Sequence, residues 1–269
     1  MTHSSHVDTT KPHSARVYDY WLGGKNNYEV DEAAAEQVQK VWPSVRRGAQ
    51  HNRAFMHRAV HYLASEAGVR QFLDIGTGIP TQPNLHQIAQ GVDPTARVVY
   101  VDNDPIVLVY ASALLRSAPG GRLAYLHADA TDARSIINAP EFTDTIDLDE
   151  PVALSLVALL HLISDERGAH ELVEGLMDVL PSGSYLMLAH ATADLNPEQM
   201  AAVAEMYGKT TTTGGQLRTH AEVMTFFDGM DLVDPGLVPT HRWRPRPDQD
   251  LPEIADAEIC AYAAIARKR

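Results

Sequence analysis

The sequence predicts an α/β fold with a doubly wound, mostly parallel sheet, and two observations support this prediction. From residue 69 onward, short β-rich apolar runs alternate with helical patterns, which is typical of βαβ units. The last two apolar runs follow each other with no helical pattern between them, so we expect antiparallel pairing at one edge of the sheet. Strands are expected at residues 71–75, 97–101, 123–127, 152–159 and 184–189, and within 230–245 and 256–269.

The region before the sheet is predicted to be a helical cap, residues 15–68. A first helix is expected over residues 31–42, which begin with an acidic residue and are followed by proline. A second helix is expected over residues 44–67, because apolar residues recur there at helical spacing and Gly68 is a natural C-terminal stop. Residues 1–14 are rich in Ser, Thr and His and are expected to form a disordered tail.

Residues 69–269 are expected to form one domain that contains the whole sheet. The intervals between the predicted strands have helical patterns, as the alternation of strands and helices requires. Helices are expected at residues 84–90, 104–117, 166–180 and 220–227.

The composition excludes several classes of protein. The chain has 269 residues and a formal net charge of −13, which disfavours sequence-independent binding to nucleic acids, because such binding needs a basic face. Cys260 is the only cysteine, so a disulfide within the chain and a cysteine-rich zinc site are excluded and a reducing, cytoplasmic location is expected. The first residues lack a signal-peptide core, and the longest apolar run, residues 152–163, is too short to cross a membrane. We therefore expect no nucleic-acid or membrane partner, and the oligomeric state is left open.

The stretch RQFLDIGTGIPTQPN, residues 70–84, joins the first predicted strand to a glycine-rich turn. One interpretation is the dinucleotide fingerprint G-x-G-x-x-G, which would indicate an NAD(P)-dependent oxidoreductase. Its third glycine position is Thr81 here, and the next acidic strand end, Asp102, lies 26 residues after Gly76 rather than about 20. The fingerprint is therefore incomplete.

A second interpretation is a D-x-G-x-G turn, in which Asp74 precedes Gly76, Thr77 and Gly78. Glycines let the backbone approach a ligand closely, because no Cβ stands in the way. A carboxylate at the strand end favours a cation, and S-adenosylmethionine carries both an ammonium and a sulfonium group. The turn therefore favours S-adenosylmethionine over a pyrophosphate.

Two further acidic residues follow the next two predicted strands. Asp102 ends the second strand, where its carboxylate can accept hydrogen bonds from both ribose hydroxyls of a nucleoside. Asp129 follows the third strand, where it can accept a hydrogen bond from an adenine amino group. The alternative for Asp129 is a helix N-cap, a role for which Thr131 and Asp132 also compete. Three acids at successive strand ends indicate a nucleoside site at the carboxyl edge of the sheet.

These stretches resemble the class I S-adenosylmethionine-dependent methyltransferases, because FLDIGTG, VVYVDNDP and LHADATD occur in the order of that family's motifs. The sequence is more closely similar to an actinobacterial methyltransferase family long catalogued as a domain of unknown function. ARVYDYWLGGKNNYEVD, NRAF, LPSGSYLMLAHAT and LVDPGLVPTHRWRP carry this resemblance, which covers nearly the whole chain from Ala15. It implies a Rossmann-like sheet of seven strands, the last antiparallel, with the cofactor over the first two.

The resemblance also implies a role for individual residues around S-adenosylmethionine. These residues are Asp74, Gly76, Thr77 and Gly78 at the methionine part, Asp102 at the ribose, Asn103 beside the adenine, Asp129 and Ala130 at the adenine edge, and Leu160 and His161 near the methyl group. The chain lacks the Asn/Asp-Pro-Pro-Tyr/Phe motif of many amino-directed nucleic-acid methyltransferases. We therefore expect a small-molecule acceptor.

An acceptor that loses a proton during methyl transfer needs a base. His161 and His190 are the candidate bases, because each lies at or just past the carboxyl end of a predicted strand. The alternative for each is a histidine whose hydrogen bonds are satisfied within the core. His57 and His61 lie one helical turn apart, but no third ligand accompanies them and no metal is expected.

The segment ARVYDYWLGGKNNYEV, residues 15–30, crowds aromatic residues around two glycines. It forms either a lid over the cofactor and acceptor or a hydrophobic clasp that packs the first helices onto the sheet. As a lid, it would bring Tyr18 to the cofactor and Lys25 to the cofactor's carboxylate.

The expected function is methyl transfer from S-adenosylmethionine to a small-molecule acceptor. Two alternatives are a module that binds S-adenosylmethionine without catalysis, as a sensor, and the NAD(P)-dependent oxidoreductase. The sensor alternative stays open because a fold does not determine an activity.

Overall fold

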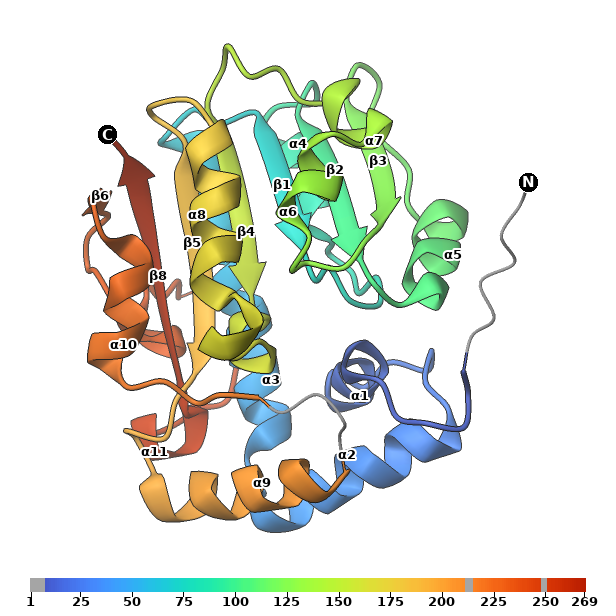
Figure 1. Ribbon diagram of the computed structural model, residues 1–269, viewed down its shortest axis with the longest axis vertical. Helices are drawn as coiled ribbons and strands as arrows, with labels where there is room; N and C mark the ends of the chain where they lie inside the picture. Colours follow the sequence, from blue (N-terminus) through green and yellow to red (C-terminus); the bar gives the residue numbers. More distant parts are fainter. Residues whose placement is uncertain (1–7, 211–214, 248–250) are drawn as a thin grey trace.

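The computed structural model describes residues 8–210, 215–247 and 251–269 and contains one mixed sheet flanked by helices (Figure 1). The strands are β1 (Gln71–Ile75), β2 (Arg97–Asp102), β3 (Arg122–His127), β4 (Val152–Val157), β5 (Tyr185–Ala191), β6 (Met230–Leu232), β7 (Val238–Pro239) and β8 (Ala261–Lys268). Their order is β3-β2-β1-β4-β5-β8-β6, and β7 pairs with β8 off this path. The first five strands are parallel, whereas β8 is antiparallel to β5, β6 and β7.

The strand order determines where this fold binds ligands. β1 lies between β2 and β4, so the chain winds away from β1 in both directions. Doubly wound sheets bind ligands beyond the carboxyl ends of the strands at such a switch point. The predicted Rossmann-like, mostly parallel sheet with antiparallel last strands is confirmed, and residues 238–239 add a short eighth strand to the seven expected.

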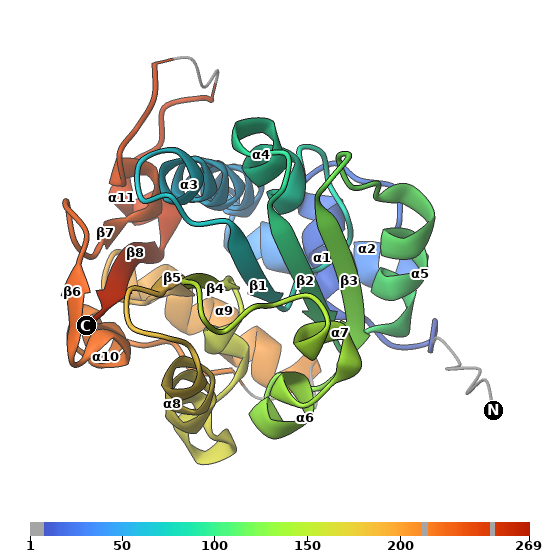
Figure 2. The same cartoon turned by 90° about the horizontal axis from the view of Figure 1, so that it is seen from above.

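Helices cover both faces of the sheet, which explains why its strands are apolar on both sides (Figure 2). One face carries α3 (Val45–Ser65), α4 (Leu85–Val92) and α5 (Pro105–Leu114), and the other carries α6 (Ala133–Ile137), α7 (Pro140–Thr143), α8 (Ala169–Val179) and α10 (His220–Met224). Side chains of β1 alternate between the two cores, since Phe72 packs with Phe55 of α3 and Leu73 packs with Leu172 of α8. Asp74 therefore faces the α3 side.

The N-terminal helices lie at the carboxyl edge of the parallel strands, in the lower part of Figure 1. α1 (Ser14–Trp21), α2 (Glu29–Val41) and α9 (Pro197–Thr210) meet there. Trp21 and Val38 are buried in one apolar cluster, against which Met206 of α9 packs. The helices predicted over residues 31–42 and 44–67 are confirmed as α2 and α3.

The loop between α1 and α2 is built around the buried Asp19. The Asp19 carboxylate accepts hydrogen bonds from the Asn26 backbone N–H at 2.9 Å and from the Asn27 side chain at 2.8 Å. Gly23 has a φ of +82°, and a Cβ on Gly24 would lie 2.0 Å from an Asp19 oxygen. Both glycines are therefore required by the backbone of this loop.

The C-terminal segment differs from its prediction. The sequence predicts a strand over residues 256–269, whereas Asp256–Ile259 form the short helix α11 and the strand begins at Ala261. Cys260, expected inside this strand, lies between the two elements with a φ of +45° and is fully buried. Within residues 230–245 only β6 and β7 are strands.

The sequence also did not predict the helices α1, α6, α7 and α9 or the end of β4. α1 includes the first residues of the segment expected to be a lid or clasp, and α9 begins at Pro197 directly after Asn196, a typical helix start. β4 ends at Val157, two residues earlier than predicted, because Ala158 adopts a left-handed φ of +59°.

The division into a tail, a cap and a cofactor-binding domain stays a prediction. Residues 1–7 of the predicted tail lie outside the described residues. Nearer to the cap, Arg16 donates a hydrogen bond to the Asp8 carbonyl at 3.1 Å and the His13 N–H donates one to the Asp31 carboxylate at 2.9 Å. Ser14, also placed in the tail, is the first residue of α1.

Candidate cofactor site

The turn after β1 contains the D-x-G-x-G motif. Gly76 and Gly78 have φ values of +70° and +69°, which favour glycine. The N–H groups of Gly76 and Thr77 donate to the Val101 carbonyl at 2.8 and 3.2 Å, so this turn is attached to the end of β2. A Cβ on Gly76 would lie 2.8 Å from Leu159 Cδ1, whereas one on Gly78 would meet no described atom within 4 Å. The backbone at Gly78 is therefore open to a ligand.

Asp102, at the end of β2, connects two loops of this edge. One carboxylate oxygen accepts a hydrogen bond from the Gly78 N–H at 2.8 Å, and the other accepts one from the Asp104 N–H at 2.9 Å. Asp102 is only 6% exposed, and burial raises its pKa, although the two backbone hydrogen bonds oppose the increase. Each oxygen has a second lone pair, so the carboxylate keeps acceptor positions for two hydroxyl groups.

Asp74 and Ser155 lie opposite each other on β1 and β4, the strands that flank the switch point. Burial raises the pKa of Asp74 to about 6, and the Ser155 hydroxyl and the charge of Arg53 oppose the increase. Ser155 is fully buried, and its hydroxyl lies close enough to Asp74 to lower the pKa of that carboxyl, although Oγ forms no well-aligned hydrogen bond within the described ranges. Buried hydroxyls normally have a hydrogen-bond partner, so this position is suited to a polar ligand group.

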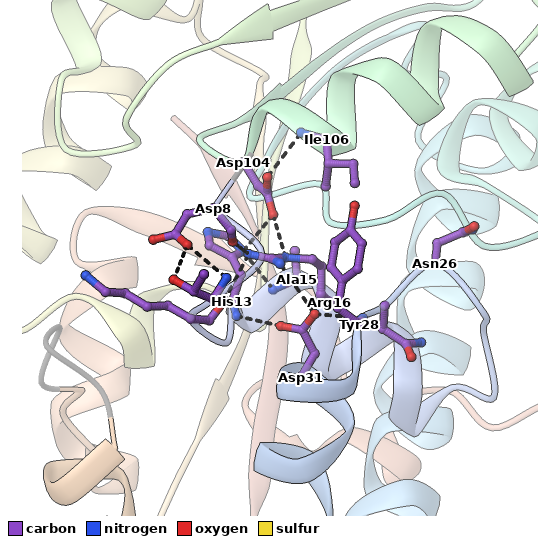
Figure 3. Close-up of polar contacts among 12 residues, drawn as sticks. Asp8, His13, Ala15, Arg16, Asn26, Tyr28, Asp31, Asp104 and Ile106 are labelled. Atoms are coloured by element: carbon purple, nitrogen blue, oxygen red, sulfur yellow. Dashed lines mark hydrogen bonds and ion pairs between the residues drawn. The ribbon is translucent and has the colours of Figure 1, made fainter. Parts of the chain in front are cut away.

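Arg16 of α1 attaches the N-terminal helices to the loop after β2 (Figure 3). This buried residue donates from Nε to an Asp104 carboxylate oxygen at 3.1 Å and from Nη1 to the Asp31 carboxylate at 3.4 Å. His13 Nδ1 lies 3.3 Å from the same Asp104 oxygen. Because the Asp104 N–H donates to Asp102, the cluster places the cap next to the predicted ribose position.

His190, one of the two predicted bases, has a protein partner at each ring nitrogen. Its Nδ1 lies 2.6 Å from the Ala191 carbonyl, and its Nε2 lies 2.8 Å from Arg218 Nη1. Arginine can only donate, so Nε2 accepts and Nδ1 carries the proton. Burial holds the pKa of His190 well below its usual range. Both ring nitrogens of His190 are therefore engaged within the protein.

His161, the other predicted base, packs edge to face against His190, with ring centroids 5.7 Å apart. Its Nδ1 is buried, and no described residue forms a hydrogen bond with it. Burial, together with the nearby charge of Arg218, lowers the pKa of His161 to about 4. His161 is therefore a neutral imidazole at pH 7 and can accept a proton.

Arg218 holds the loop after β4 in place from a fully buried position. Its guanidinium donates to the Leu160 and Ile163 carbonyls, each at 3.0 Å, and to the Asp165 carboxylate at 2.6 Å. His161 lies within the loop that these hydrogen bonds fix. The orientation of His161 thus depends on a residue from a distant part of the chain.

Two predicted adenine contacts lie at the rim of the site. Asn103 is exposed, and its carbonyl lies 3.0 Å from His127 Nε2. Asp129 is also exposed, and its Oδ1 accepts hydrogen bonds from the Thr131 N–H and hydroxyl. The N-cap of α6 is Asp132, so Asp129 stabilises a turn instead of the helix end.

The remaining predicted cofactor residues differ in how close they lie to the glycine turn. Ala130 is half-buried against the core, and Leu160 is fully buried in it. The side chain that lies close to Gly76 is that of the neighbouring Leu159. The Tyr18 hydroxyl forms hydrogen bonds with two residues of α3. Lys25 is exposed on the loop between α1 and α2.

Direct contacts around the glycine turn thus connect only some of the predicted cofactor-binding residues. Those residues are Asp74, Gly76, Thr77, Gly78 and Asp102. Sequence reasoning missed Ser155, Arg53 and Arg218 as site residues. The sequence contained a hint for two of them, because Ser155 is a polar residue within an apolar strand and Arg53 lies within the NRAF stretch. The sequence contained no such hint for Arg218, since the residues that it contacts come from distant segments of the chain.

A model of the S-adenosyl methyltransferase family matches residues 1–269. The chain belongs to this family. It is similar to a DUF574 family protein from Streptomyces avermitilis, with 49% identity and a TM-score of 0.94 over 98% of this chain and 100% of that chain. It is also similar to a candidate methyltransferase from Thermobifida fusca, with 39% identity and a TM-score of 0.89 over 97% of each chain.

More distant comparisons inform only the fold. An O-methyltransferase family protein from Burkholderia thailandensis is 16% identical and superposes with a TM-score of 0.53, over 83% of this chain and 59% of that chain. No protein of curated function matches.

As a member of the S-adenosyl methyltransferase family, the chain has S-adenosylmethionine as its cofactor. The residues at the switch point fit this molecule. The open backbone at Gly78 and the acceptor positions of Asp102 suit a nucleoside, and the buried Ser155 hydroxyl beside Asp74 suits a polar group farther along the ligand. The half-buried Asp74 carboxylate suits a cation.

No helix in residues 8–210, 215–247 and 251–269 is long and apolar enough to cross a membrane. The same ranges contain no group of three or more His, Cys, Asp or Glu side chains that could hold a metal ion. His57 Nε2 instead lies 3.1 Å from the Pro83 carbonyl, and His61 faces Ser65.

The raised pKa of Asp74 predicts that this carboxylate destabilises the ligand-free protein. Because the folded pKa of about 6 exceeds the ordinary value of 3.8, wild-type stability should fall as the pH rises from about 4 to about 6. Asp74→Asn should then increase the free energy of unfolding at pH 8 by up to about 3 kcal/mol and change it little at pH 4. Urea unfolding at both pH values measures this.

Asp93→Asn is the matched control, because hydrogen bonds from Thr95 and Arg70 lower the pKa of Asp93 to about 2. This variant should lose stability at pH 8 instead of gaining it. A loss of stability in Asp74→Asn at pH 8 would contradict the destabilising role of Asp74.

Proposed function

We propose that this member of the S-adenosyl methyltransferase family transfers a methyl group to a small-molecule acceptor. The observation that carries the proposal is the open backbone at Gly78 between the carboxylates of Asp74 and Asp102. Two acids favour ribose hydroxyls and a cationic group, whereas a pyrophosphate would require convergent N–H donors and positive charge. The net charge of −13 supports a small molecule over a nucleic acid as the acceptor.

In this proposal the cofactor lies along the carboxyl edge from β1 to β3. The turn of Gly76, Thr77 and Gly78 lies along its thioether part, and Asp102 accepts hydrogen bonds from both ribose hydroxyls. Asn103, Asp129 and Ala130 border the adenine. Since Thr131 occupies Oδ1 of Asp129, the other oxygen of that carboxylate is the one for the adenine amino group.

Methyl transfer is an in-line displacement, so the protein must align the acceptor and exclude water. When bound, S-adenosylmethionine supplies a methyl group that its sulfonium already activates. His161 takes the acceptor's proton at Nδ1, because its pKa of about 4 leaves it neutral at pH 7 and no described group competes for that nitrogen. His190 and Arg218 act through His161 by holding its ring and its loop.

The sensor that binds S-adenosylmethionine without turnover is the second candidate. The partnerless, buried Nδ1 of His161 favours the enzyme, because binding alone does not require an unprotonated base beside the switch point. The cytoplasmic location that the single cysteine favours stays a prediction, which cell fractionation tests.

Two experiments test the function. Thermal unfolding with S-adenosylhomocysteine or NADH identifies the ligand class, and stabilisation by NADH alone would overturn the proposal. Incubation of the protein with methyl-labelled S-adenosylmethionine and the small-molecule fraction of a cell extract should then label a product. Binding without label transfer in any extract would favour the sensor.

Asp102→Asn should weaken S-adenosylhomocysteine binding by about 1–3 kcal/mol, because the amide cannot accept at both oxygens. Calorimetric titration measures the change. The control Asp93→Asn alters an acid just before β2, at the opposite end from Asp102, and should bind like wild type. Equal affinities for wild type and Asp102→Asn would remove Asp102 from the ribose position.

His161→Gln should reduce the rate of label transfer about 100-fold or more while leaving the S-adenosylhomocysteine dissociation constant within about twofold, because only a proton acceptor is lost. The wild-type rate should show no His161 titration between pH 6 and 8, since the lowered pKa lies near 4. His61→Gln, on the surface of α3, is the control. An unchanged rate in His161→Gln would rule out this base.

The segment from Tyr18 to Tyr28 is proposed to close over the cofactor, because Arg16 attaches it to Asp104 beside Asp102. Chymotrypsin should then cleave this segment more slowly when S-adenosylhomocysteine is bound. Arg16→Met should accelerate cleavage in both conditions. Identical cleavage with and without the ligand would favour a fixed hydrophobic clasp.

A further inference from the structure

Arg53 projects from α3 toward the loop that follows the glycine turn. One of its terminal nitrogens, Nη2, donates hydrogen bonds to the Thr81 carbonyl and to the Pro83 carbonyl, the latter at 3.0 Å. Its Nε is buried, and no described group accepts a hydrogen bond from it. Arg53 therefore has a donor without a partner at the edge of the cofactor site.

Strand geometry places Asp74 and Ser155 on the same side of the sheet as Arg53. Phe72 and Ala153 pack in the core beneath α3, and side chains two residues farther along each strand point to the same face. Those residues are Asp74 on β1 and Ser155 on β4, which lie directly opposite each other. Three polar groups thus meet between α3 and the carboxyl ends of the two central strands.

The charges of Arg53 and Asp74 are opposite and close enough to shift each other's pKa. The Arg53 charge lowers the pKa of Asp74 against the effect of burial, and Asp74 in turn raises the pKa of Arg53 against its burial. The guanidinium and the carboxylate act on each other through their charges, without a hydrogen bond between them. A ligand that carries both an ammonium and a carboxylate would complement both groups.

We propose that Arg53 binds the carboxylate of the cofactor's amino-acid group while Asp74 binds its ammonium, an inference that rests on the proposed cofactor site. The partnerless Nε gives the guanidinium a directed hydrogen bond to that carboxylate in addition to its charge. Ser155, buried between the strands, donates its hydroxyl to the same end of the ligand. The pair thereby selects a zwitterionic nucleoside over a neutral one.

This assignment replaces Lys25, which the sequence predicts for the carboxylate. Lys25 is exposed on the loop between α1 and α2, where water screens its charge. Arg53 comes from a long helix that packs on the sheet, so its guanidinium is held near Asp74 before any ligand binds.

Arg53 also fastens the loop of Thr81 and Pro83, so the experiment must separate this structural role from recognition. Three ligands achieve the separation by calorimetric titration. S-adenosylhomocysteine carries both charged groups, S-adenosyl-3-thiopropylamine keeps the ammonium but lacks the carboxylate, and 5′-methylthioadenosine lacks both.

Arg53→Gln should weaken S-adenosylhomocysteine binding about 10- to 100-fold, a loss typical of a charge-assisted hydrogen bond, and leave the other two ligands within about twofold. Asp74→Asn should weaken S-adenosylhomocysteine and S-adenosyl-3-thiopropylamine but not 5′-methylthioadenosine. Arg47→Gln, which removes an exposed arginine of the same helix that pairs with Glu258, should leave all three affinities unchanged.

Equal loss of all three ligands in Arg53→Gln would assign Arg53 to the loop alone and overturn the proposal, as would unchanged binding of S-adenosylhomocysteine. If Arg53→Gln does not fold, Arg53→Lys keeps the charge without the directed Nε donor and should still lose S-adenosylhomocysteine affinity selectively. If Lys25→Ala, rather than Arg53→Gln, selectively lost affinity for S-adenosylhomocysteine, Lys25 would be the residue that binds the ligand carboxylate. Failure of the wild type to bind any of the three ligands would overturn the proposed function as well.

Discussion

The carboxylate of Asp102 is the contact on which the cofactor edge depends. It receives hydrogen bonds from Gly78 in the turn after β1 and from Asp104 in the loop after β2. Asp104 in turn receives Arg16 from the first helix. A buried carboxylate is unfavourable without donors, so these hydrogen bonds favour the close approach of the three segments. One acid thereby determines the shape of the glycine turn and the position of the cap.

Several carboxylates lie at the same edge of the sheet. In the ligand-free protein, nearby positive charges or hydrogen-bond donors partly offset the negative charge of each one. Asp31 and Asp104 share the buried guanidinium of Arg16. The pKa of Asp74 stays raised because the Ser155 hydroxyl, the charge of Arg53 and the Thr77 hydroxyl offset only part of the effect of burial. Groups kept in an unfavourable state are common where a ligand later neutralises them. An ammonium beside Asp74 is such a ligand group, which is why charge as well as shape supports S-adenosylmethionine at this edge.

The loop after β4 is organised by a second, separate network. Arg218 donates hydrogen bonds to the Leu160 and Ile163 carbonyls, to His190 and to Asp165. The Nδ1 of His161, in the same loop, is buried and forms no hydrogen bond with a described residue. In the proposed function, the cofactor and the acceptor therefore depend on different residues. Changes at Arg218 and changes at Asp102 should therefore affect different steps, the first the alignment of the acceptor and the second the binding of the nucleoside.

The sequence by itself determined the sheet, the glycine turn and the acids at the strand ends, because strand patterns and turn residues are local features of the chain. Asp74, Gly76, Gly78 and Asp102 were all predicted, and direct contacts connect them in the structure. It also indicated the family through motifs that a model of that family matches. Only the tertiary structure decided which of the two candidate bases, His161 and His190, keeps a nitrogen without a partner, because Arg218 reaches His190 from a position 28 residues away. Likewise, Arg53 meets the switch point only when α3 packs over β1. Such pairings depend on packing between distant segments, to which neither periodicity nor spacing in the chain gives access.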